Sequence, residues 1–231
     1  MNKKIVVLTG SGISAESGLK TFRDSGGLWE NYDVSQVASI DGWRANKEFM
    51  LKFYNERRKQ LESAKPNTAH KSLARLEEKY DVQIITQNVD NLHERAGSKS
   101  VLHLHGLLTQ ARSSIDVNLV YDIGYKEINL EDRCEKGSQL RPNVVWFGEA
   151  VPLIDKALEI CSAANIFIVI GTSMVVYPAA GLIESVPKNA EIYVIDPVKP
   201  NLNGKFENIT FIQEPATIGT EKLVNQLLSE D

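Results

Sequence analysis

Short runs of apolar residues recur along the whole chain. They are rich in β-branched side chains and are apolar throughout, rather than alternating with polar residues. Strands that helices cover on both faces have this pattern, which is typical of parallel sheets. We therefore expect buried parallel strands at 5–8, 82–86, 143–147, 166–170, 192–195 and 209–212.

Helical patterns lie between these runs. Asn67 follows Pro66 at the start of one of them, which is typical of a helix N-cap. The alternation of strands and helices predicts an α/β protein with a Rossmann-like, doubly wound parallel sheet. The expected helices cover 49–62, 67–80, 153–164 and 221–230.

Two stretches do not fit this alternation. Residues 28–80 are largely helical and long, and residues 107–141 are polar and irregular. We expect both to form a smaller module inserted into the sheet domain, with a helical part and a part like a degenerate zinc ribbon. The Rossmann-like sheet domain would then comprise 1–27, 81–106 and 142–231.

Composition limits the partners and the cellular location that we expect for this protein. Of its 231 residues, 42% are hydrophobic and 24% are charged, and the net charge is -4 without a basic stripe. We therefore expect neither nucleic acid nor a membrane as a partner. The N-terminal apolar run is too short for a signal peptide, and no apolar stretch reaches the ~20 residues of a membrane span. With only two isolated cysteines, a cytoplasmic location is expected.

A glycine-rich segment, TGSGISAESG, follows the first apolar run. Glycine permits a sharp turn and lets a ligand approach the backbone, and a helix start favours pyrophosphate. The segment therefore suggests a dinucleotide site. It does not follow the usual G-x-G-x-x-G spacing, because position 15 is Ala, and no P-loop motif is present. A tight strand–helix turn without a ligand is the alternative.

Further polar or small-residue clusters follow other strands. TFRDSGGLWE carries a cation, Arg23, and an apolar lid candidate, Phe22, while LHLHG places His103 and His105 two apart. Ligands of open α/β sheets bind at the carboxyl ends of strands, where TQNVDNLHERAG and GTSMVVYPAAG lie. Each cluster alone also fits helix capping or a turn, but clusters at successive strand ends favour a ligand.

Together these segments resemble the sirtuin family of NAD-dependent protein-lysine deacylases. The motif sequences are most similar to those of the bacterial class of sirtuins that prefers acidic acyl groups. The resemblance covers nearly the whole chain, in the family's order. Its motifs are TGSGISAESGLKTFR, TQNVDNLHERAG, HLHG, NVVWFGE and GTSMVVYPAAG.

The resemblance implies roles for individual residues. His105 would be the general base, acting with Asn88 and Asp90, and Val145, Phe147 and Gly148 would pair with the substrate peptide. The family usually has alanine where Ser11 stands and often asparagine where Asp196 stands. The implied NAD-binding residues are Gly10, Ser11, Gly12, Ala15, Glu16, Phe22, Arg23, Gln87, Asn88, Asp90, Gly171, Thr172, Ser173, Asp196 and Ala216.

The segment FYNERRKQ bears on the acyl group. Tyr54 and Arg57 are three residues apart, so they share one face of the expected helix. A guanidinium can grip a carboxylate through two parallel bonds, and a phenol adds a third. An ordinary solvated face is the alternative, because Arg58 and Lys59 follow. In the family this pair marks removal of succinyl and malonyl groups, and acetyl is expected as well. The implied products are nicotinamide and O-acyl-ADP-ribose.

The sequence departs from the family at its structural zinc. Most sirtuins carry two C-x-x-C pairs in this interval, but here Ser113 and Ser114 stand where the first begins, and only Cys134 remains of the second. Structural zinc requires four Cys or His ligands, so we expect no zinc. The module would instead be held by apolar packing of Ile115, Val117, Leu119, Val120, Tyr121, Ile123 and Ile128.

Two other functions use the same cofactor site. An NAD-glycohydrolase or ADP-ribosyltransferase would need no acyl-lysine channel, and Tyr54, Arg57 and the VVWFGE segment argue against it. The other is a non-catalytic sensor of NAD or ADP-ribose that lost its activity together with the zinc. Four intact residues argue against it: Gln87, Asn88, Asp90 and His105.

Overall fold

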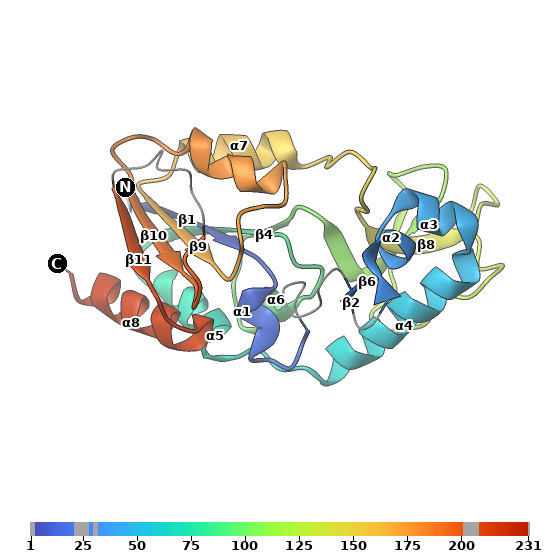
Figure 1. Ribbon diagram of the computed structural model, residues 1–231, viewed down its shortest axis with the longest axis horizontal. Helices are drawn as coiled ribbons and strands as arrows, with labels where there is room; N and C mark the ends of the chain where they lie inside the picture. The colour runs from blue at the N-terminus through green and yellow to red at the C-terminus, as the bar shows by residue number, and fades with distance from the viewer. Residues whose placement is uncertain (1–2, 21–27, 30–31, 201–207, 231) are drawn as a thin grey trace.

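A six-stranded parallel sheet forms the centre of the larger part of the molecule (Figure 1). The computed structural model describes residues 3–20, 28–29, 32–200 and 208–230. β1 lies inside the sheet, with β4 on one side and β9 on the other. The strands, in spatial order, are β11 (Ile209–Ile212), β10 (Glu191–Ile195), β9 (Ile166–Ile170), β1 (Lys4–Thr9), β4 (Asp81–Thr86) and β5 (Val101–His103).

Helices cover both faces of this sheet, as expected for a doubly wound fold (Figure 1). Alternate side chains of β1 enter opposite cores: Ile5 and Val7 pack with α5 and α8, whereas Val6 and Leu8 pack with α7 and η2. Burial on both faces explains why the strand is apolar throughout. These four helices are α5 (Thr68–Leu76), α7 (Ile154–Ser162), η2 (Ala179–Ser185) and α8 (Ala216–Ser229).

A second module lies beside the sheet and has its own core (Figure 1). Its antiparallel strands have the order β7–β6–β8, and Trp43 and Trp146 are buried between them and the helices. Its elements are α2 (Val34–Val37), α3 (Ile40–Ala45), α4 (Lys47–Ser63), β6 (Gly106–Ser113), β7 (Val120–Asp122) and β8 (Leu140–Val144), with the short pair β2 (Leu28–Trp29) and β3 (Tyr32–Asp33) beside them.

Three details differ from the sequence-based expectations. The run 143–147 is not a strand of the parallel sheet; β8 ends at Val144 and pairs antiparallel with β6. The sixth parallel strand is β5 instead. α5 packs in the core of the large sheet, although residues 28–80 were expected to belong wholly to the smaller module. The division into two modules otherwise stays a prediction.

The expected apolar core of the 107–141 segment is partly wrong. Ile115, Val117 and Val120 are exposed, at 70%, 60% and 41% of their surface, so they lie outside it. Ile128 is buried and Ile123 packs at the edge of the same core. α4 also contacts this segment, because Asn55 and Arg58 donate hydrogen bonds to the carbonyl oxygens of Ile128 and Lys126. In the described ranges, no helix combines the length and apolarity needed to cross a membrane.

Candidate functional site

Two glycine loops meet at the carboxyl edge of the sheet, between β1 and β9. The chain passes from β1 to strands on one side and later returns to the other side, so this edge is a topological switch point, where α/β sheets bind ligands. The Gly12 N–H donates to the Gly171 carbonyl at 2.9 Å. A Cβ on Gly12 would lie 2.6 Å from the Gly171 Cα, and one on Gly10 would lie 2.7 Å from the Thr172 Cβ. The glycines therefore let the loops pack together, which the sequence alone did not reveal.

A cavity of about 480 Å³ opens beside these loops and extends into the smaller module. It is bounded on the far side by α4 and by the segment after β8. The expected site residues that line it are Gly10, Ser11, Tyr54, Arg57, Gln87, Asn88, Asp90, His105, Val145, Phe147, Gly148, Gly171, Thr172 and Ser173.

Five expected cofactor residues are not part of this lining. Asp196 is buried and accepts a hydrogen bond from the Val198 N–H. Glu16 accepts from the N–H and hydroxyl of Thr217, which ties α1 (Gly12–Ala15) to the start of α8. Gly12 and Ala15 lie on α1, and Ala216 opens α8. Their expected contacts with NAD stay predictions. Phe22 and Arg23 fall outside the described residues.

Asn88 and Asp90 are joined by a hydroxyl that the sequence analysis did not assign to the site. The Ser14 hydroxyl donates to Asp90 Oδ2 at 2.9 Å and accepts from Asn88 Nδ2 at 3.1 Å. Burial raises the pKa of Asp90, although the Leu92 N–H and the Ser14 hydroxyl counteract this effect. Ser14 lies on α1, so the glycine-rich segment helps to orient both side chains. Its place two residues after a glycine was the available signal.

A second series of hydrogen bonds joins the carboxyl ends of β1 and β4. These strands are in register at Thr9 and Thr86, whose hydroxyl oxygens lie 2.8 Å apart. The Thr9 hydroxyl also lies 3.1 Å from His93 Nε2. The Thr86 hydroxyl accepts from the Asn88 N–H, and Gln87 Nε2 donates to the Thr172 hydroxyl at 3.2 Å. The backbone that presents Gln87 and Asn88 is therefore held on both sides.

His105 faces the cavity as a neutral base. Its Nδ1 lies 3.0 Å from the Gln87 carbonyl oxygen, which can only accept, so Nδ1 carries the proton and Nε2 carries the lone pair. Burial lowers the pKa of His105, and the hydrogen bond to Gln87 opposes this only in part. Gly106 follows with φ +83°, and a Cβ there would lie 2.0 Å from the Asn143 oxygen. The turn into β6 therefore requires glycine at position 106.

His103 has a different environment. Its Nε2 lies 2.6 Å from Glu94 Oε1, and its Nδ1 lies 3.3 Å from the Asn88 carbonyl oxygen. Burial lowers the pKa of His103, but the hydrogen bond and charge of Glu94 outweigh burial, so the net pKa is raised. His103 does not line the cavity. It therefore supports Asn88, whereas His105 is exposed to a ligand.

Tyr54 and Arg57 are buried on α4 and line the same cavity as His105. Their side chains are 0% and 9% exposed, so a solvated helix face does not describe them. Arg58 is buried too, and it donates to the carbonyl oxygens of Lys126 and Tyr54. Of the basic residues in this segment, Lys59 is the exposed one.

Backbone hydrogen bonds already join the segment after β8 to other parts of the chain. The Val145 N–H donates to the His105 carbonyl, and the Phe147 N–H donates to the Ala38 carbonyl, both within 3 Å. The Phe147 carbonyl accepts from Ile40. The Phe147 N–H is therefore already paired within the chain, and the expected pairing of Val145, Phe147 and Gly148 with a peptide stays a prediction. Phe147 itself is 52% exposed at the cavity mouth.

The positions of the family's zinc ligands hold a hydrogen-bonded cluster instead. The hydroxyls of Ser113 and Ser138 lie 2.8 Å apart, and Cys134 Sγ lies 3.4 and 3.2 Å from them. Lys136 pairs with Asp116 across the same turns at 2.7 Å. Within the described residues no three His, Cys, Asp or Glu side chains are grouped to hold a metal. This donor set does not fit zinc.

The parallel sheet, its switch point and the polar side chains that line one part of the cavity are typical of a nucleotide-binding α/β protein. The chain belongs to the Sir2 family, whose model matches residues 10–178. It is 52% identical over 226 residues to an NAD-dependent protein deacylase of Helicobacter pylori, with 98% of each chain covered. It is 50% identical to an NAD-dependent protein deacylase of Bacteroides thetaiotaomicron, again with 98% of each covered. A crystal structure of a Sir2 homologue with NAD superposes with a TM-score of 0.88 at 38% identity, covering 98% of this chain and 90% of that one.

Proposed function

We propose that this chain, an NAD-dependent protein deacylase of the Sir2 family, removes succinyl, malonyl and acetyl groups from protein lysines. The observation that best supports this proposal is that Tyr54 and Arg57 line the same cavity as His105, Asn88 and Asp90. One end of the cavity therefore suits a nucleotide, and the other presents a cation and a phenol. An acidic acyl group fits that second end.

The residues present fit NAD. The paired glycine loops leave bare backbone at the switch point, and Ser14, Asn88 and Asp90 are buried polar groups beside it. Gln87, Asn88 and Asp90 would hold the nicotinamide half, and Gly171, Thr172 and Ser173 the adenosine half. When bound, NAD would supply a ribose carbon made electrophilic by the loss of nicotinamide, and a ribose hydroxyl oxygen that would receive the acyl group.

The remaining work falls to this chain's own side chains. His105 Nε2 can accept a proton from a hydroxyl placed in the cavity, because its other nitrogen is committed to Gln87. Such general-base help contributes about 10²–10⁴ in rate. The apolar walls formed by Leu108, Val144 and Phe147 restrict water near the reacting groups. Arg57 binds and orients the acyl end without taking part in the proton transfer.

Arg57→Met tests the acyl preference. Removal of the guanidinium deletes a charged hydrogen bond, so kcat/KM for a succinyl-lysine peptide should fall about 10–100-fold. The value for the matching acetyl-lysine peptide should change far less. Lys59→Met is the matched control, because it removes the same charge from the exposed side of α4. Mass spectrometry of both peptides with and without NAD measures the rates.

Equal losses on the two peptides in Arg57→Met would show that Arg57 does not read the acyl group. The same assay separates the alternative functions. A glycohydrolase would release nicotinamide without changing any peptide, and a sensor would bind NAD without either product. The buried position of Arg57 favours the deacylase.

A further inference from the structure

Trp146 makes a buried contact that sets how Tyr54 can hydrogen-bond. Its indole Nε1–H donates to the Tyr54 hydroxyl oxygen at 2.7 Å, and the two side chains are 2% and 0% exposed. An indole N–H is a donor only. The Tyr54 oxygen must therefore accept on this side, and its own proton is directed elsewhere. The Tyr54 proton therefore points away from Trp146 and can be donated to a different acceptor.

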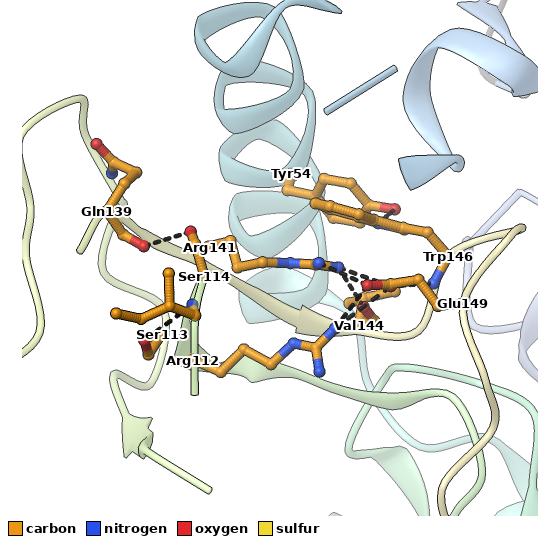
Figure 2. A network of polar contacts seen from close by, with 10 residues as sticks. Tyr54, Arg112, Ser113, Ser114, Gln139, Arg141, Val144, Trp146 and Glu149 are labelled. Atoms are coloured by element: carbon orange, nitrogen blue, oxygen red, sulfur yellow. Dashed lines mark hydrogen bonds and ion pairs between the residues drawn. The ribbon is translucent and has the colours of Figure 1, made fainter. Parts of the chain in front are cut away.

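Trp146 is held by a charged network rather than by packing alone (Figure 2). Its backbone N–H donates to Glu149 Oε2 at 2.9 Å, and the Arg141 guanidinium lies 3.4 Å from its ring centroid. Arg141 donates to both Glu149 oxygens at 2.7 and 2.9 Å, and Arg112 on β6 donates to the same two oxygens at 3.1 and 3.3 Å. The indole therefore has little freedom to turn away from Tyr54.

The charges near Tyr54 favour an anion. Arg57 and Arg141 act on its hydroxyl as cations, against the single carboxylate of Glu149. Burial raises the pKa of Tyr54, so the phenol keeps its proton at neutral pH. Burial alone would raise the pKa of Glu149, but the Arg141 hydrogen bond and charge outweigh it, and the net pKa is lowered. Glu149 therefore stays charged and keeps Arg141 in place.

We propose that Trp146 is a positioning residue for acyl selectivity: its N–H fixes the Tyr54 hydroxyl as a donor toward the acyl carboxylate. A carboxylate only accepts hydrogen bonds, so a phenol with a fixed outward proton complements it. An acetyl group offers no such acceptor at its end. This inference rests on the proposed preference for acidic acyl groups.

Trp146→Phe keeps a ring but removes the N–H. The ratio of kcat/KM for succinyl over acetyl peptides should fall about 3–10-fold, the worth of one neutral hydrogen bond. The loss should lie in KM for the succinyl peptide rather than in kcat. Trp43→Phe is the matched control, because Trp43 belongs to the same buried cluster, 5.4 Å from the Trp146 ring, and its indole does not bond to Tyr54 among the described contacts. It should leave the ratio unchanged.

Tyr54→Phe completes a double-mutant cycle. In that background, Trp146→Phe should produce no further fall in the ratio, because the hydroxyl that it orients is gone. An unchanged ratio in Trp146→Phe, or equal losses on both peptides, would overturn the inference. If Trp146→Phe lowers the unfolding midpoint markedly, 3-benzothienylalanine at position 146 replaces the indole with a ring of the same shape that lacks the N–H. With that residue too, an unchanged ratio or equal losses on both peptides would overturn the inference.

The outcomes also separate this inference from the proposed function. If the unaltered chain does not remove succinyl groups, or if Arg57→Met has no effect on the ratio, the acyl preference itself is wrong. If Arg57→Met and Tyr54→Phe lower the ratio but Trp146→Phe does not, the preference stands and the role of Trp146 is wrong.

Discussion

At the scale of single residues, the surroundings of each histidine in the site set its protonation state. His105 is neutral because it is buried, and the Gln87 carbonyl holds its proton on Nδ1. His103, two residues earlier, is paired with Glu94 and has a raised pKa. The same residue type therefore serves as a base in one place and as a support in the other. Environment, not identity, separates the two roles.

The pH dependence of activity should follow His105. Its pKa is lowered, so the base is available at neutral pH and is lost as pH falls through a value below 6.5. The profile of kcat/KM reports the free enzyme. We expect its acidic limb to have a midpoint below 6.5 on the succinyl and acetyl peptides alike.

His105→Ala provides the control for this profile. It should lose about 10²–10⁴ in kcat and still bind NAD, because the nucleotide contacts come from other residues. An acidic midpoint above 6.5, or a variant that retains most of its activity, would show that another group is the base.

At the scale of elements, α4 joins the cavity to the turns of the smaller module. Its inner face carries Tyr54 and Arg57, and Arg58 on the same helix donates to the Lys126 carbonyl at 3.1 Å. Asn55 adds bonds to the backbone of Ile128 at 3.0 Å. Burial lowers the pKa of Arg58 to about 10, which leaves it charged at neutral pH. The turns of the module are thus anchored to α4.

The module should not depend on a metal. A structural zinc contributes about 10–16 kcal/mol to folding, so its removal from a protein that uses one is severe. Here the turns are joined by Ser113, Ser138 and Cys134 and by the Lys136–Asp116 pair. We expect EDTA to leave the thermal unfolding midpoint and the activity unchanged.

Metal analysis of the purified chain completes that test. Zinc should be well below one equivalent, and added zinc chloride should not raise the midpoint. One tightly bound equivalent of zinc, with a large loss of stability in EDTA, would contradict this interpretation of the cluster.

At the scale of the whole molecule, two buried histidines should make stability depend on pH. His70 and His93 are 0% exposed, and their rings lie 4.9 Å apart between α5 and α6 (Leu92–Arg95). Burial lowers the pKa of His70 to about 4 and that of His93 well below its ordinary value. In the unfolded chain both take up protons near pH 6.5.

The sign of the effect follows from proton uptake. Below pH 6.5 the unfolded state binds more protons than the native state. The free energy of unfolding therefore has its full value above pH 6.5 and falls as the pH decreases toward 4. The loss from His70 alone is of order 3 kcal/mol. Urea unfolding at pH 7.5, 6.0 and 5.0 measures it, and His70→Gln should flatten the slope. Stability that rises between pH 6.5 and 5 would contradict this account.

The sequence predicted the sheet because burial on both faces leaves a simple apolar signature, as in β1 and β9. It misplaced residues 143–147, because a short apolar run does not reveal which sheet it joins. It missed the hydrogen bonds of Ser14 and Trp146, because their partners lie 76 and 92 residues away in the chain. It placed Tyr54 and Arg57 together because one helix carries both.

The most direct test of the central claim is a single reaction that contains succinyl-lysine and acetyl-lysine peptides, the purified chain and NAD. Mass spectrometry should show loss of both acyl groups, faster for succinyl, together with nicotinamide and O-acyl-ADP-ribose, and no change without NAD. If both peptides stay intact in the presence of NAD, or if only nicotinamide and ADP-ribose form, the deacylase account is contradicted.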